Sequence, residues 1–170
     1  MENDIRWVNL ERVLNEFADA VIEKARENLE RNGTNASYGL YDSIGAEKIV
    51  EIGEDRFSVK ISLADYWKYV ENGRGPGKYP PPDAIRKWIE VKPVSIQPDR
   101  NGRTPSVEQV TFLVSRKIAE EGTEPQPFLE PAKDEVLARF EPLIDQAIQD
   151  DIDAYINDLV EGMMKRIFGR

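Results

Sequence analysis

The sequence of 170 residues contains neither cysteine nor histidine. Without cysteine the chain cannot form disulfides, thiolate metal sites or a cysteine nucleophile. Without histidine it lacks a common metal ligand and the side chain that most often acts as general base near neutral pH. These two absences close most routes to a hydrolase or a metalloenzyme. We therefore expect a protein that is not an enzyme and that holds no cofactor and no metal.

Long apolar runs are also missing from the sequence. The longest runs span a few residues, whereas roughly 20 are needed to cross a bilayer. Residues 1–7 lack a basic region followed by an apolar stretch, which is the pattern of a secretory signal. We therefore expect a protein that is made in a cytoplasm and has no membrane contact.

Positive charge is scarce, with 23 Lys and Arg against 32 Asp and Glu and a net charge of −9. Residues 72–103 are the exception, with a local charge of +4 that leaves −13 for the remainder. A basic segment on an acidic body suits a head-to-tail contact between copies of the chain, or a phosphate backbone, although ordinary solvated charge is the simpler alternative. The candidate interface cations are Arg74, Lys78, Arg100 and Arg103.

Apolar residues recur at steps of three and four in five segments, which predicts helices. The expected helices are residues 10–32, 65–71, 83–90, 106–121 and 131–168. We expect Asn9 to cap the first, Gly33 to end it, Pro82 to begin the third, and Pro142 to kink the last or start its second part. The expected buried positions are Val107, Val110, Val114 and Ile118 in the fourth helix, and Phe140, Ile144, Ile148, Ile152, Tyr155, Leu159, Met163 and Ile167 in the last.

Two short segments, residues 48–52 and 57–63, predict strands joined by a hairpin turn at residues 53–55. Alternation in the second strand predicts that Phe57, Val59, Ile61 and Leu63 are buried on one face. Because two strands alone are marginally stable, a third is expected from residues 94–97 or from a partner. The sequence thus predicts an α+β fold in one domain over residues 1–170: a small, mostly antiparallel sheet packed by helices, with a core at about 10–132 and a C-terminal helical extension at 133–170.

Two patterns suggest chemistry but fit it poorly. Residues 73–78 resemble a phosphate-binding loop, yet the first required Gly is Asn72 and the Ser or Thr after the Lys is Tyr79. Asp150, Asp151 and Asp153 suggest a carboxylate-metal nuclease. Consecutive helical residues point about 100° apart, so these three carboxylates do not converge, and a solvated acidic helix face is the preferred interpretation.

Five stretches between residues 39 and 132 resemble the motifs of one known family. Residues 39–44 are similar to its G-x-L-x-x-S-I stretch, and residues 66–73 to Y-A-x-Y-V-E-x-G-T, with Arg74 where Thr is usual. Residues 80–89 and 112–123 resemble the proline-led helix and the second helix of its longer members. Residues 125–132 resemble R-P-F-L-x-P-A, with Gln126 in the Arg position. The family is the tail-completion, or head–tail joining, proteins of tailed bacteriophages, often labelled gene-product-ten-like.

This resemblance implies a structural virion protein, made and assembled in the host cytoplasm, that forms a six- or twelve-fold ring in the phage neck. Its partners would be the portal–adaptor complex and the tail-tube or tail-terminator proteins, and double-stranded DNA would pass through without specific binding. Asp150, Asp151 and Asp153 would then border the lumen, where like charge repels phosphates. The alternatives are a tail-terminator ring, and, from other classes, the nuclease or a monomeric adaptor.

Aromatic residues dominate two of the motif stretches. Tyr66 and Tyr69 lie on a two-turn helix and are candidates for core packing or for an interface between protomers. Phe128 and Leu129, between Pro127 and Pro131, are predicted to form a rigid plug that enters the core just before the last helix.

Overall fold

The computed structural model describes residues 5–33, 39–53, 56–91, 98 and 102–169. Its elements, in chain order, are α1 (Val8–Arg31), α2 (Gly39–Ser43), β1 (Lys48–Ile52), β2 (Phe57–Ile61), α3 (Trp67–Glu71), α4 (Pro82–Val91), α5 (Val107–Glu121) and α6 (Leu129–Phe168). The predicted α+β fold with a long C-terminal helix is confirmed.

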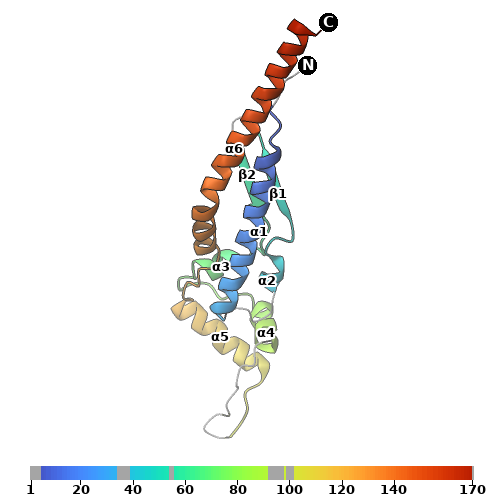
Figure 1. Ribbon diagram of the computed structural model, residues 1–170. Helices are drawn as coiled ribbons and strands as arrows, with labels where there is room; N and C mark the ends of the chain where they lie inside the picture. Colours follow the sequence, from blue (N-terminus) through green and yellow to red (C-terminus); the bar gives the residue numbers. More distant parts are fainter. Residues whose placement is uncertain (1–4, 34–38, 54–55, 92–97, 99–101, 170) are drawn as a thin grey trace.

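The antiparallel pair of α1 and α6 forms the spine of the molecule (Figure 1). Phe17 of α1 meets Phe140 of α6 edge to face, with ring centroids 5.7 Å apart. Lys24 of α1 pairs with Glu135 of α6 at 2.9 Å, and its hydrogen bond to that carboxylate raises the pKa of Lys24. The core extends past the predicted boundary at residue 132, because α6 remains buried against α1 as far as Ala147.

A two-stranded antiparallel sheet covers the other side of α1 (Figure 1). Its register pairs Lys48 with Ile61 and Ile52 with Phe57, as the predicted hairpin requires. The predicted burial of the second strand is wrong at Phe57, which is 45% exposed, and only partial at Val59, Ile61 and Leu63. Ile61 and Leu63 contact the core, whereas Phe57 lies at the far end of the hairpin. The strand expected at residues 94–97 falls outside the described residues.

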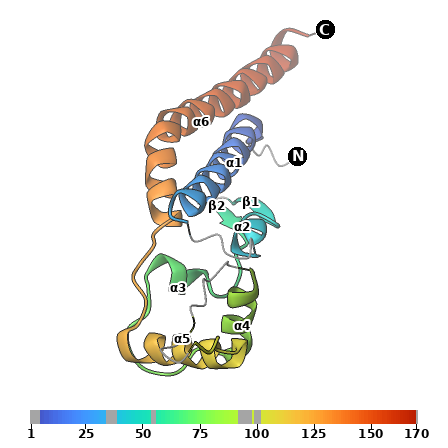
Figure 2. The same ribbon diagram turned by 90° about the horizontal axis from the view of Figure 1, so that it is seen from below.

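Helix α5 shows how local signals set the ends of an element. Ser106 and Gln109 form a reciprocal capping box at its start, and Gly122, with φ of 82°, ends it. Its predicted buried side is only half-buried, and the buried residues are Thr111 and Ser115. The valine side is only half-buried because α5 packs against α4 and against the proline-rich loop that precedes α4. Both helices lie below the main core in Figure 2.

Helix α6 runs for 40 residues without interruption at Pro142, and it changes direction along its length (Figure 2). Its predicted apolar stripe is buried at Phe140 and half-buried from Ile144 to Leu159, but Met163 and Ile167 are exposed. The prediction fails there because α1 begins at Val8, so the last turns of α6 extend beyond it (Figure 1). None of the described helices is both long and apolar enough to span a membrane.

Candidate assembly site

The start of α1 is capped by a side chain from α6. Trp7 occupies the N-cap position and makes no side-chain cap, so the predicted cap by Asn9 is wrong. Instead, the carboxylate of Asp151 accepts hydrogen bonds from the backbone N–H groups of Asn9 (3.0 Å) and Leu10 (2.9 Å) and from Asn9 Nδ2 (2.8 Å). Asp151 is 3% exposed. A negative charge at a helix N-terminus also interacts favourably with the helix dipole.

The start of α6 is capped in the same manner by Glu71, the last residue of α3. Its Oε2 accepts from the backbone N–H groups of Phe128 and Leu129, each at 2.9 Å, and its Oε1 accepts from that of Glu130 at 3.0 Å. Three N–H groups that no turn of α6 could satisfy are thus paired with one buried carboxylate. Glu71 and Asp151, the capping carboxylates, fix where the two long helices begin.

The predicted plug is confirmed at Phe128, which is fully buried. Phe128 packs with Ala25 and Leu29 of α1 and with Leu40 and Ile44, while Leu129 is half-buried against this cluster. Its backbone is also held, because the carbonyl of Phe128 accepts a hydrogen bond from Nδ2 of the buried Asn28 at 2.9 Å.

Next to this cap the chain crosses itself closely. Arg74 and Thr123 form an antiparallel bridge, with N···O distances of 3.0 and 2.8 Å, and Gln126 N donates to Val70 O at 2.9 Å. Gly73 and Gly122 flank the bridge with positive φ, and a side chain on either would collide with the facing backbone. The crossing, defined here as residues 70–74 and 122–126, therefore requires glycine at two places.

The structure brings some of the predicted interface residues to this crossing. Tyr66, which precedes α3, is 45% exposed, and Tyr69, which lies within α3, is 61% exposed. Arg74 is half-buried at the bridge, where its guanidinium donates to the carbonyl of the exposed Lys78. The two tyrosines and two cations thus follow one another along a single stretch of surface chain.

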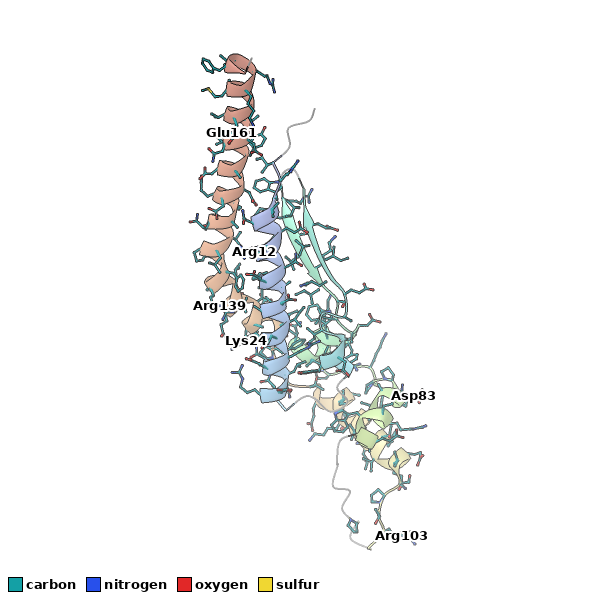
Figure 3. All side chains as sticks on the ribbon, turned by 45° about the vertical axis from the view of Figure 1, so that its right-hand side comes forward. Arg12, Lys24, Asp83, Arg103, Arg139 and Glu161 are labelled. Atoms are coloured by element: carbon teal, nitrogen blue, oxygen red, sulfur yellow. The ribbon has the colours of Figure 1, made fainter. Side chains whose placement is uncertain are left out.

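The other two predicted interface cations lie elsewhere. Arg103 precedes α5, whose other end meets Arg74, and 15 helical residues separate these ends by about 22 Å. Figure 3 shows Arg103 at the end of the molecule opposite Glu161. Arg100 lies outside the described residues. Among the described residues, the cations of the segment 72–103 are therefore spread over α4 and the chain on either side of it, and Arg74 and Arg103 do not share one patch.

The three acidic residues of α6 do not act together. Asp150 and Asp153 are exposed and accept hydrogen bonds from Gln146 and Gln149 of the same helix, at 2.8 and 2.9 Å. Asp151 is buried, so it does not belong to a solvated acidic face. For the same reason, the prediction that it borders a lumen is wrong for this residue. Within the described ranges, no group of three or more acidic side chains could hold a metal ion.

An open concavity of about 430 Å³ lies between α4, α5 and the proline-rich loop. Tyr79, Pro80, Arg86, Glu108, Phe112 and Ser115 contribute to its wall. A backbone hydrogen bond at the start of α5 lowers the pKa of Glu108, with a smaller contribution from Ser106. The arrangement offers shape and apolar surface, but the polar groups there do not form a catalytic pair.

Sequence reasoning missed both capping carboxylates. Glu71 lies in a motif stretch and Asp151 in an acidic run, and both patterns suggest an exposed carboxylate. The donors that they accept from are 57 to 142 residues away in the sequence. One available signal was the absence of Ser, Thr, Asp or Asn at the N-cap positions Trp7 and Phe128. A second, for Asp151, was its helical phase, because it follows Phe140 by about three turns and so lies on the same side of α6. No family model, curated protein or solved structure matches the chain.

Proposed function

We propose that this protein is a structural component of the neck of a tailed-phage virion, where it forms a cyclic ring that joins the portal–adaptor complex to the tail. The ring leaves a lumen through which double-stranded DNA passes without specific binding. The surface of α3 and the loop that follows, with Tyr66, Tyr69, Arg74 and Lys78, contacts the next protomer or the adjoining ring. The chain acts as a scaffold, with no catalytic step.

One observation supports the proposal most strongly. It concerns residues 66–73 and 125–132, two of the motif stretches that resemble the tail-completion family. Glu71 of the first stretch is hydrogen-bonded to Phe128 of the second, although 57 residues separate them in the sequence. In the structure they form one unit, because the Glu of the first caps the helix that starts at the Phe-Leu of the second. Motif residues that would otherwise be unrelated thus have a shared structural reason to occur together.

The ring also fits the exposed chemistry of this unit. An interface between protomers needs aromatic anchors with a polar rim, and the exposed Tyr66 and Tyr69 precede the crossing along the chain while Arg74 lies in it and Lys78 follows it. The −13 remainder of the chain supplies acidic surface for those cations to meet.

The test is to disrupt the gene in the phage that encodes it and to examine lysates by negative-stain electron microscopy. We expect DNA-filled heads and tails of normal length that remain separate, and joined particles after complementation with the wild-type gene. Tails of uncontrolled length would point to a tail terminator. Joined, infectious particles without the protein would refute the proposal.

A further inference from the structure

The free end of α6 carries apolar side chains over more than half of its circumference. Ile152, Tyr155 and Leu159 are half-buried on one side. The exposed residues on the other sides are Ile156 (49%), Val160 (52%), Met163 (57%), Met164 (51%), Ile167 (65%) and Phe168 (71%). Exposed apolar side chains of this size are normally covered by another element, and the described part of this chain leaves these uncovered. Figure 1 shows this end of α6 extending beyond α1.

The exposed stripe faces away from the body of the protein. Asp151 points at α1, and Val160 follows it by nine residues, which at 100° per residue places Val160 on the opposite side of the helix. The same outward side is polar earlier in α6, at Asp145, Gln149 and Asp153, all of which are exposed. The change from polar to apolar occurs where α6 passes the start of α1.

The spacing of the stripe is that of a coiled-coil seam. Ile156, Val160, Met163 and Ile167 follow one another at steps of four, three and four. This order is the same when read in either direction. Two copies that run antiparallel therefore place Ile156 opposite the partner's Ile167 and Val160 opposite the partner's Met163, which is the self-complementarity that a two-fold contact requires.

Charge favours the antiparallel orientation. The end of α6 is acidic at its root, with Asp153, Asp158 and Glu161, and basic at its tip, with Lys165 and Arg166. Figure 3 shows Glu161 well beyond the start of α1. Antiparallel copies oppose the two helix dipoles and bring each basic tip level with the partner's acidic root along the axis, while Asp158 and Lys165, which lie opposite the stripe at 100° per residue, stay outside the contact. Parallel copies would place the like-charged ends of the two helices at the same level.

We propose that a second copy of this chain covers the end of α6, so that the protein in solution is a dimer held by an antiparallel helix pair over residues 156–167. This dimer does not depend on the proposed neck function, and it leaves the crossing at residues 70–74 and 122–126 exposed for other contacts.

The mass of the full-length protein is measured by sedimentation equilibrium, and we expect twice the chain mass. Val160→Asp places an unpaired charge in the centre of the seam and should raise the dimer dissociation constant roughly 100-fold. The matched control is Leu143→Asp, because Leu143 is 48% exposed on the same helix and lies outside the stripe. At a protein concentration low enough for the wild type and both variants to be monomeric, the two variants should have the same melting temperature as the wild type.

Orientation is tested by cross-linking, which is simple because the chain has no cysteine. Ile156→Cys and Ile167→Cys are made separately, mixed, and oxidised. The antiparallel pair predicts a disulfide between the two different variants and little cross-linking of either with itself. A monomer at all concentrations, an oligomer that survives Val160→Asp, or cross-links only between identical variants would each overturn the proposal.

Discussion

Glu71 and Asp151 are the two buried acidic residues among those described, and each satisfies three donors from a distant part of the chain. Because α1 and α6 are antiparallel, the two capping carboxylates lie at opposite ends of the helix pair (Figure 1). A buried charge is tolerated when its hydrogen bonds are complete, and each of these replaces a cap that the local sequence does not supply.

Replacing Glu71 with Gln should destabilise the protein by at least about 2 kcal/mol, because one carbonyl oxygen replaces two carboxylate oxygens and the new amide N–H₂ faces backbone donors. Urea denaturation measures the change. The control, Glu120→Gln, alters only an exposed pair with Arg116 and should stay within about 0.5 kcal/mol. Equal effects of the two variants would show that the cap contributes nothing specific.

Asp151→Asn should cost about 1–2 kcal/mol of folding free energy, since it weakens the cap of α1 and leaves an amide group facing N–H donors. Asp153→Asn, two residues along the same helix, should change stability by less than about 0.5 kcal/mol because its carboxylate is exposed. Thermal unfolding of the two variants, side by side, measures the difference. If Asp153→Asn proved the more destabilising, the assignment of roles would be wrong.

Phe128→Ala should cost roughly 3–5 kcal/mol, because the ring is fully buried and its removal leaves a cavity between α1 and α2. This is a large share of the stability of an ordinary domain, so we expect poor solubility or a large fall in melting temperature. A variant that melted normally and failed only in assembly would instead place Phe128 at an interface.

At the scale of residues, the sequence predicted the burial of Phe128 but not the burial of either capping carboxylate. Phe128 lies between prolines in an apolar motif, and burial follows from its own chemistry. Helical phase places Asp151, but not Asp150 or Asp153, on the same side of α6 as Phe140. That a carboxylate belongs there depends on the backbone of Asn9, which is 142 residues away and which local sequence reasoning does not reach.

At the scale of elements, most helix ends follow from local chemistry that is visible in the sequence. Pro82 begins α4, and Gly33, with φ of 64°, follows the end of α1, as predicted. Burial was harder to predict, because apolar spacing shows which residues share a face but not whether another element covers it. Among the described residues, the expected cover is partial on the valine side of α5 and missing at Phe57 and at the tip of α6.

The crossing beside α3 gives a prediction about two glycines with similar φ. Gly122→Ala should destabilise the protein more than Gly102→Ala, by at least about 1 kcal/mol, because a methyl group at position 122 meets the carbonyl of Arg74 while position 102 is open. Both glycines have positive φ, and Gly122, with ψ of −159°, lies in a region that is essentially restricted to glycine, which adds to the cost of the alanine there. Chemical denaturation of both variants measures the difference, and equal losses would mean that the crossing relaxes freely.

At the scale of the whole molecule, the pair of α4 and α5 lies at one end of the spine and the tip of α6 at the other (Figure 1). The sequence predicted a basic segment on an acidic body, but it could not show that Arg74 and Arg103 lie at opposite ends of α5. Charge counted along a chain becomes a patch only where the fold brings the residues together.

If the proposed ring surrounds DNA with the outward side of α6 at its lumen, replacing Asp150 and Asp153 with Lys should slow DNA ejection. Each new cation can hold a phosphate, and the effect should be larger at low salt. Asp151 is left unchanged because it caps α1. The measurement is the ejection rate of assembled particles. A normal rate at low and high salt would remove these residues from the lumen and leave the ring proposal standing.

The pairing of the first helix with the last has a consequence for biosynthesis. The clusters that bury α1 take Phe128, Ala132, Val136, Phe140 and Ala147 from α6. A ribosome that has made the first hundred residues has therefore released an amphipathic helix with no partner for most of its apolar face. Contacts of such large sequence separation form late and slowly, so the nascent chain remains exposed to aggregation until α6 emerges. Burial of α1 therefore waits until α6 has left the ribosome.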